Sequence, residues 1–482
     1  MKEGLQLRDS QVAALAFGLT QPKLMNLSDP GVGKTAPTCA YMWHLWSTQG
    51  VKSVWPQPKS LLVKNRQELL DWSNFKPEEV IIIDGTKQQR AEQIADPRGK
   101  VWLMGFKRWS DDWKLILEHH PEIKHMAVDE FHLGYSTWGS KQTQAWYESS
   151  KKMKSMVIMT GTIIRGRLTS AFPAIHAIEP RYYGHYGNFL AQHAIMDEYD
   201  TIYGWKGHAK LAEIFRRHGF RRTFEDEYGK EAKVIIPETV EMSPKQREAY
   251  REFEEAAVLE LEDSFLMGDQ PAVNAIRCRQ ILAHPETFGL CLSETTGKDE
   301  RLKIHFGDAA QSGDPIAVFA ALVPEQERIV KLATSMGLRA ALINGNVPAT
   351  KRAKIDEQFR AGLLDCVVAS PATAGIGFNW AHLKTMVFAS TDYMDDSFIQ
   401  AYRRGIRGQR DSPLLIYVLE YRDSIEQRIF QIIENKSKDA NKVDPTKEVF
   451  QLSGQTAEKR AAKGASTQAK KTGLSMADMI KR

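Results

Sequence analysis

Short apolar runs rich in β-branched residues recur in two series along this chain, and they constrain its fold more than any other feature. The first series lies at residues 60–63, 80–84, 101–105, 126–130 and 156–160. The second lies at 316–320, 339–343, 366–370, 385–390 and 414–420. Helical patterns separate the runs, and such alternation is typical of parallel sheets covered on both faces. Between the series, from about residue 170 to 295, the pattern is helical and polar. We therefore predict an α/β chain of two lobes with a helical middle.

The length of the chain agrees with two lobes. At 482 residues it exceeds the ~250 to 300 residues at which a single hydrophobic core stops growing. Its 42% hydrophobic and 26% charged residues are typical of a globular chain. No apolar run approaches the ~18 residues that a membrane span requires, and the first residues lack the apolar region of a signal peptide. We therefore expect a cytoplasmic protein with no membrane partner.

The four cysteines lie far apart in the sequence, and none belongs to a CxxC pair. This spacing indicates neither a zinc site nor a disulfide framework, so we expect buried, reduced thiols. They are Cys39, Cys278, Cys291 and Cys366.

A glycine-rich segment at 28–35 is a candidate phosphate-binding loop. Gly31 and Gly33 allow the backbone to turn with its N–H groups pointing inward, around Val32. Lys34 would then reach the outer phosphates, and the hydroxyl of Thr35 would bind magnesium. One departure from the usual pattern is Ser28, which stands where the loop normally begins with glycine or alanine.

An acidic pair follows the fourth apolar run of the first series. Asp129, at the C-terminal edge of a strand, is positioned to hold magnesium, and Glu130 to polarise an attacking water. The alternative for an isolated pair of this kind is an exposed acidic turn. Its place behind a phosphate loop and at a strand end favours the catalytic interpretation.

Two arginines of the second half complete the pattern. Arg404 and Arg407 are three residues apart and share one face if the segment 400–409 is helical. A guanidinium presented across a cleft is the usual stabiliser of charge in phosphoryl transfer, whereas a basic helix face without a catalytic role is the alternative. The loop, the acidic pair and these arginines together predict an ATP site between two lobes.

The chain resembles superfamily 2 helicases, and within them the SWI/SNF-like DNA translocases. Segments that are similar to the family's motifs occur in the family's order over nearly the whole chain. They are 7–11, 28–35, 60–72, 128–132, 159–162, 221–250, 278–285, 341–352, 372–380 and 400–409. Two departures are the missing residue before Gly408 and Ile163 in place of the common proline. Neither removes a catalytic group.

The resemblance implies two RecA-like lobes, each a parallel sheet flanked by helices, with the ATP site in the cleft between the lobes. It implies lobe one at 1–232, lobe two with a helical insertion at 233–445, and a basic tail at 446–482. Its cofactors would be ATP and magnesium, the latter held by Thr35 and Asp129. The catalytic residues it implies are Lys34, Asp129, Glu130, Arg404 and Arg407. The ATP-binding residues it implies are Gln11, Asp29, Gly31, Val32, Gly33, Lys34, Thr35, Gly375 and Gly377.

In such a motor, ATP binding closes the lobes and hydrolysis opens them, which moves the protein stepwise along DNA. DNA contacts in this family are made to the phosphate backbone, so little sequence specificity is expected. The residues that the resemblance assigns to DNA are Lys64, Asn65, Lys107, Arg108, Thr162, Gly345, Asn346 and Thr373. An exposed charged turn is the alternative for Lys107 and Arg108. The resemblance is to compact bacterial or viral members, which implies a bacterial or phage protein.

Three functions remain open from the sequence. The favoured one is an ATP-dependent translocase on duplex or forked DNA that remodels junctions or displaces bound proteins. The second is a strand-separating or branch-migrating helicase. The third is a nucleic-acid-binding or partner-binding module in which ATP is only a switch, and the intact Glu130, Arg404 and Arg407 argue against it.

The last residues form a basic segment. From 455 to 482 there are seven basic and two acidic residues, a net charge of +5 that equals the formal net charge of the whole chain. Most of this segment lacks a core-forming pattern, so we expect a flexible arm that binds DNA or an acidic partner, such as a replication or repair protein. A solvated tail without a partner is one alternative. A short docking helix at 474–482 is the other.

Overall fold

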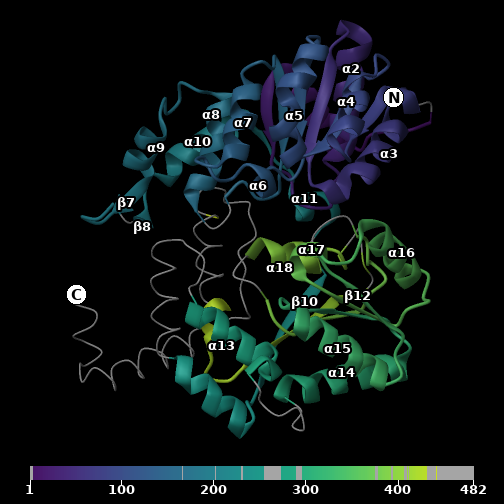
Figure 1. The fold of residues 1–482 in the computed structure, drawn as a ribbon, viewed down its shortest axis with the longest axis vertical. Helices are drawn as coiled ribbons and strands as arrows, with labels where there is room; N and C mark the ends of the chain where they lie inside the picture. The colour runs from purple at the N-terminus through teal and green to yellow at the C-terminus, as the bar shows by residue number, and fades with distance from the viewer. Residues whose placement is uncertain are drawn as a thin grey trace.

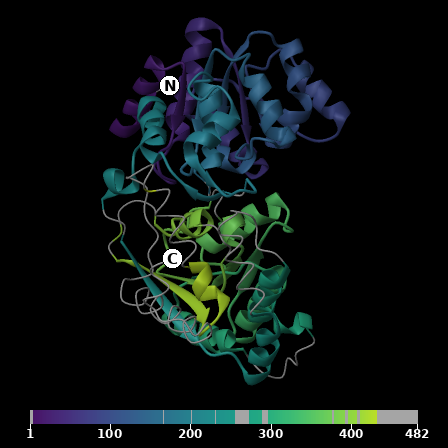
Figure 2. The same ribbon diagram turned by 90° about the vertical axis from the view of Figure 1, so that its left-hand side faces the viewer.

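The computed structural model describes residues 4–164, 167–200, 202–229, 232–254, 273–288, 296–374, 378–391, 395–406, 410, 412–430 and 441. They form two α/β lobes, one above the other in Figure 1, and the view turned by 90° in Figure 2 shows the same separation. The predicted fold class of two lobes with parallel sheets is confirmed. No helix of these described residues is long and apolar enough to cross a membrane.

Lobe one contains a sheet of seven strands in the order β3-β4-β2-β5-β6-β1-β9, in which every pairing is parallel. Its strands are β1 (Lys23–Asn26), β2 (Lys52–Gln57), β3 (Val80–Ile83), β4 (Val101–Gly105), β5 (Ile123–Val128), β6 (Ser155–Met159) and β9 (Gly219–Phe220). Its first helices are α1 (Asp9–Thr20), α2 (Thr35–Gln49), α3 (Leu62–Trp72), α4 (Lys87–Ala95), α5 (Phe106–His119), α6 (Phe131–Gly134) and α7 (Lys141–Ser150).

Helices cover both faces of this sheet because successive strand residues point to opposite sides. In β1, Leu24 packs in a cluster with Cys39 and Met42 of α2, whereas Met25 packs in another cluster with Phe172 and Leu211. Both clusters are buried, so the strands are apolar on both faces. This is the arrangement that the short apolar runs predict.

The prediction of a strand at 60–63 is wrong. Residues 59–61 form a 3-10 helix and 62–72 form α3. Leu62, Leu69 and Leu70 are buried on one helical face, while Val63 is 76% exposed. The spacing of seven and eight residues places these leucines on one side of a helix, which outweighs the apolar content of the short run.

The middle of the chain is helical only in part. It contains α8 (Phe172–Ile178), α9 (Tyr186–His193), α10 (His208–His218) and α11 (Phe224–Tyr228), together with a hairpin of β7 (Ala194–Met196) and β8 (Ile202–Trp205). The strand β9 then returns to the sheet of lobe one and pairs with β1. A segment remote in sequence thus lies beside the candidate phosphate loop.

Lobe two contains a parallel sheet of six strands in the order β10-β15-β14-β11-β13-β12. Its strands are β10 (Lys233–Val240), β11 (Ile316–Phe319), β12 (Ala340–Ile343), β13 (Cys366–Ala369), β14 (Thr385–Phe388) and β15 (Leu414–Tyr421). Its helices include α13 (Val273–Ala283), α14 (Gly297–Ser312), α15 (Val323–Ser335), α16 (Ala349–Arg360), α17 (Pro371–Ala374) and α18 (Asp395–Tyr402). All five apolar runs of the second series therefore form the predicted strands.

Candidate active site

The candidate site lies at the C-terminal edge of the sheet of lobe one. The strands β5, β6 and β1 are neighbours in the sheet and run parallel, so their C-terminal ends meet at one edge. The loop 27–34 follows β1, the acidic pair follows β5, and residues 160–162 follow β6. The topology thus brings together three segments that the sequence analysis treated separately.

The loop has the backbone that the glycine pattern predicts. Gly31 and Gly33 both have φ of +89°, and α2 begins at Thr35. The ammonium of Lys34 donates to the carbonyls of Ser28 and Asp29, at 2.7 and 3.1 Å. Burial lowers the pKa of Lys34, and the carboxylates of Glu130 and Asp129 oppose this effect. The loop lysine and the acidic pair are therefore close enough to interact electrostatically.

Two side chains of the N-terminal segment lie against this loop. The amide of Gln11 donates to the carbonyl of Gly33 at 3.1 Å, and the guanidinium of Arg8 donates to the carbonyl of Val32 at 2.5 Å. A Cβ atom added to Gly33 would lie 2.6 Å from Arg8 Nη2 and 2.7 Å from Gln11 Nε2. The loop therefore tolerates no side chain at this position without moving both residues.

The acidic pair is held in a fixed geometry. Asp129 is buried; its Oδ1 accepts from the backbone N–H of Glu130 and its Oδ2 from the amide of Asn65, both at 2.9 Å. Burial and then the charge of Glu130 raise the pKa of Asp129 to about 6. Glu130 itself adopts a left-handed backbone with φ of 46°. Non-glycine residues in this sparsely populated conformation are enriched at functional sites.

A histidine connects the acidic pair to the end of β6. The ring Nδ1 of His132 lies 2.8 Å from the hydroxyl of Thr160 and 3.6 Å from Oε2 of Glu130. The same hydroxyl accepts from the backbone N–H of Thr162 at 3.0 Å. His132 therefore lies between the acidic pair and residues 160–162.

Asp29, two residues before Gly31, pairs with one arginine of each lobe. The carboxylate of Asp29 accepts from Arg221 at 2.9 Å, and it also pairs with Arg403 of lobe two at 3.2 Å. Burial alone would raise the pKa of Asp29, but Arg403 and Arg221 together hold it below its ordinary value. Sequence analysis missed both arginines, although Arg403 directly precedes the predicted Arg404.

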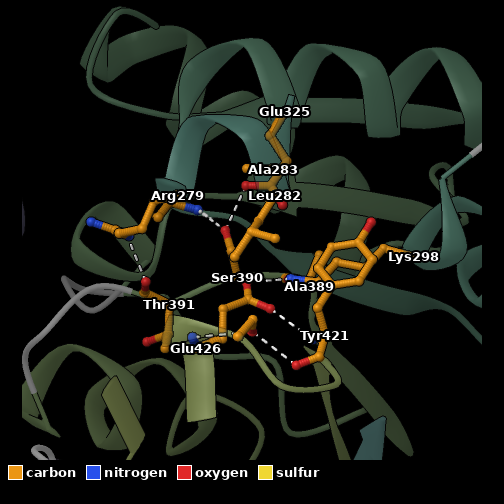
Figure 3. A network of polar contacts seen from close by, with 12 residues as sticks. Arg279, Leu282, Ala283, Lys298, Glu325, Ala389, Ser390, Thr391, Tyr421 and Glu426 are labelled. Carbon is orange, nitrogen blue, oxygen red and sulfur yellow. Dashed lines mark hydrogen bonds and ion pairs between the residues drawn. The ribbon is translucent and has the colours of Figure 1, made fainter. Parts of the chain in front are cut away.

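Charged side chains of three helices anchor residues 389–391 of lobe two, as Figure 3 shows. Lys298 of α14 donates to the carbonyl of Ala389 at 2.5 Å, and Arg279 of α13 donates to that of Thr391 at 2.8 Å. Between them, the hydroxyl of Ser390 donates to Glu325 of α15 at 2.5 Å. Three consecutive residues are thus held by three different helices.

Arg404, predicted to be catalytic, is buried beside Arg403 in the turn that follows α18, and not on the helix itself. Arg407, Gly375 and Gly377 lie outside the described residues, as does the basic tail. Among the described residues no group of three or more histidine, cysteine or acidic side chains forms a metal cluster. Of the cysteines, Cys39, Cys278 and Cys366 are buried thiols, and Cys291 lies outside the described residues.

The residues expected to contact DNA differ in how exposed their side chains are. Lys64, Lys107, Gly345 and Asn346 are exposed, Arg108 and Thr373 are half-buried, and Thr162 is buried.

Asn65, which the resemblance assigns to DNA, lies away from the surface. It is only 2% exposed, and its amide donates to Gln57 and to Asp129. Since α3 packs this face against the sheet, Asn65 orients an acidic group and does not present its amide to solvent.

The residues at this edge fit a magnesium-bound nucleotide. The start of α2 offers backbone N–H groups of the kind that bind phosphate. Lys34 supplies a cation, while Thr35 and the buried Asp129 supply oxygen atoms of the type that magnesium prefers.

Comparison with known families supports the motif order. Residues 24–287 match the SNF2-related domain, and residues 297–409 match the helicase conserved C-terminal domain. The chain is 21% identical to Protein CHROMATIN REMODELING 5 of Arabidopsis thaliana, over 90% of this chain and 27% of that protein. It is 21% identical to chromatin remodeling factor mit1 of Schizosaccharomyces pombe, over 65% of this chain and 23% of that protein. The chain thus spans about a quarter of the length of these relatives.

Two solved structures are similar in fold. The Pyrococcus furiosus Hef helicase domain aligns with a TM-score of 0.52 at 14% identity, covering 88% of this chain and 98% of that one. The Sulfolobus solfataricus SWI2/SNF2 ATPase core in complex with dsDNA aligns with a TM-score of 0.41 at 18% identity, covering 93% and 98%. At these identities, the Hef likeness supports the two-lobed helicase fold alone.

Proposed function

Because this chain belongs to the SNF2-related family, we propose that it is an ATP-dependent DNA translocase, which couples ATP hydrolysis to movement along DNA. The observation that carries the proposal is the meeting of the two lobes at the phosphate loop, where Asp29 of lobe one pairs with Arg403 of lobe two. A nucleotide bound at this loop lies where both lobes contact it, so its hydrolysis changes how they meet.

In this proposal each side chain at the edge has one role. Lys34 binds the outer phosphates, and Glu130 orients and polarises the attacking water. Arg404 and Arg407 stabilise the charge that develops on the phosphates. Thr35 and Asp129 hold magnesium, which when bound neutralises phosphate charge.

The proposed partner is duplex or forked DNA, bound through its phosphate backbone. Exposed Lys64, Lys107, Gly345 and Asn346 support backbone contacts on the two lobes. Such binding releases counterions, so affinity should fall steeply with salt and depend little on sequence. A strand-separating or branch-migrating helicase is the second candidate, and a strand-displacement assay with forked and blunt substrates separates it from a translocase.

We also propose that the basic tail adds affinity for DNA or an acidic partner and takes no part in catalysis. Truncation at Gly454 should leave the ATPase rate unchanged and weaken DNA binding, flattening its salt dependence by about 0.9 in slope per lost phosphate contact. Unchanged DNA binding with loss of a protein partner would instead support a docking helix. Loss of folding or of basal ATPase activity would contradict both interpretations.

The test of the proposed function is the ATPase rate without DNA and with single strands, duplexes, forks and four-way junctions. Wild type should be stimulated by one or more of these DNAs. Lys34→Ala should lose nucleotide binding and turnover, whereas Glu130→Gln should keep ATP bound and lose hydrolysis. Lys87→Ala, on the exposed surface, is the matched control and should behave as wild type.

Two outcomes of this test refute the assignment. Wild-type turnover in Lys34→Ala would show that the loop does not bind the phosphates. Equal ATPase rates with every DNA and with none would leave an ATP-dependent switch as the better function.

Arg404→Ala and Arg407→Ala should each slow turnover by about 10³-fold while ATP still binds.

A further inference from the structure

The carboxylate of Asp29 is a buried junction of two lobes. Asp29 is 4% exposed and Arg403 6% exposed, so their pairing is shielded from solvent. Oδ1 accepts from Arg221 Nη2 at 2.9 Å, and Oδ2 accepts from the backbone N–H of Phe224 at 3.1 Å and lies 3.2 Å from Arg403 Nη2. A single negative charge therefore faces one cation from each lobe.

The backbone of Asp29 is held as firmly as its side chain. Its N–H donates to the carbonyl of Arg222 at 3.0 Å, and its carbonyl accepts from Lys34. Next to it, the hydroxyl of Ser28 accepts from the N–H of Arg222 at 3.1 Å. A shift of the Asp29 carboxylate would therefore also shift the loop and Lys34.

The segment 219–228 adds a second connection between the loop and lobe two. Its strand β9 extends the sheet of lobe one, and Arg221 also donates to the carbonyl of Leu27 at 2.6 Å. Phe224, however, packs in the core cluster of lobe two with Tyr250 and Phe398. Figure 1 shows α11 at the lower side of lobe one, next to the upper side of lobe two.

We propose that Arg403 is a positioning residue of the nucleotide site, which acts through Asp29 to hold the phosphate loop in its binding geometry and ties that geometry to the closure of the lobes. This inference rests on the proposed ATPase function. Arg403 differs in role from Arg404 and Arg407, because its guanidinium reaches the loop's carboxylate and is assigned no contact with the phosphates.

The experiment compares Arg403→Met, Asp29→Asn and the double variant in the full chain. If Arg403 acts through Asp29, Arg403→Met should raise the KM for ATP about tenfold and change kcat much less. Asp29→Asn should have at least this effect, because it also weakens the pair with Arg221. The double variant should be no worse than Asp29→Asn alone, because that substitution already removes the partner of Arg403. Arg403→Lys keeps the charge and should recover part of the lost affinity.

A second readout is independent of hydrolysis. Titration with a fluorescent, non-hydrolysable ATP analogue should show the same loss of affinity. Small-angle X-ray scattering of the nucleotide-free protein should give a larger radius of gyration for Arg403→Met than for wild type. Arg360→Met is the matched control, because Arg360 is exposed on α16 and pairs only locally with Asp356, four residues away; it should change neither readout.

Three results would overturn the inference. Unchanged KM, analogue affinity and radius of gyration in Arg403→Met would show that the pair does not position the loop. A large loss of kcat with unchanged KM would make Arg403 a catalytic residue that touches the phosphates. Fully additive effects of the two substitutions would show that Arg403 does not act through Asp29. If wild type lacked DNA-stimulated ATPase activity, the proposed function would fail, while the analogue and scattering measurements would still test the pair.

Discussion

Gly33 offers a direct test of how tightly the phosphate loop is built, through the substitution Gly33→Ala. Its φ of +89° costs a non-glycine residue about 1 to 2 kcal/mol. The added methyl group would also lie 2.6 Å from Arg8 Nη2 and 2.7 Å from Gln11 Nε2. Both groups are ends of flexible side chains, so they would move and give up their hydrogen bonds to Val32 and Gly33.

The expected loss of stability follows from these two effects. Each lost hydrogen bond is worth about 0.5 to 1.5 kcal/mol, so the total destabilisation of lobe one by Gly33→Ala is about 2 to 5 kcal/mol. For a domain of this size, each kcal/mol lowers Tm by about 2 to 4 °C. The Tm of lobe one should therefore fall by at least about 4 °C.

Tryptophan fluorescence is the suitable assay, because ten of the eleven tryptophans precede residue 233 and report on lobe one. Two alanine substitutions serve as controls. Gly50 has φ of +64° and nothing within 4 Å of an added Cβ, so Gly50→Ala measures the backbone cost alone. Gly139 has neither a positive φ nor a close neighbour, so Gly139→Ala should change little. Equal Tm values for Gly33→Ala and Gly50→Ala would refute the contribution of Arg8 and Gln11.

Two further predictions concern buried charges of lobe two. Burial would raise the pKa of Glu238, but Arg301 and His305 lower it to about 2. Because the pKa is depressed in the folded state, the ionised Glu238 stabilises the fold above its ordinary pKa near 4.5. This stabilisation is lost as pH falls toward 2. Urea unfolding should therefore find Glu238→Gln less stable by about 1 to 3 kcal/mol at pH 7, with the difference vanishing near pH 2, and a constant difference would contradict it. Lys298→Met removes the ammonium that lies 2.5 Å from the buried carboxylate of Glu426, and the free energy of unfolding should fall by about 3 to 5 kcal/mol. Adding Glu426→Gln should recover part of this stability. A further loss in the double variant would refute the pairing.

The family and the fold class could be predicted from the sequence, and the comparisons and the structure confirm both. Four of the five strands of the second series are central in the sheet, and β12 lies at its edge. The central four were predictable because a central parallel strand is apolar on both faces, whatever surrounds it. The predicted lobe boundaries, the site residues and the bacterial or phage origin stay predictions. The prediction of a strand at 60–63 fails because its three apolar residues suit either a strand or a buried helix turn.

What the sequence determined by itself is chemistry that lies within a few consecutive residues. The glycines of 31–33 and the acidic pair are recognisable because their backbone and charge requirements are local. Only the tertiary structure decided which side chains complete them. Arg221 reaches Asp29 across 192 positions of sequence, and Asn65 reaches Asp129 across 64. Such partners carry no local signature, because parallel strands bring distant segments to one edge only after the sheet has formed.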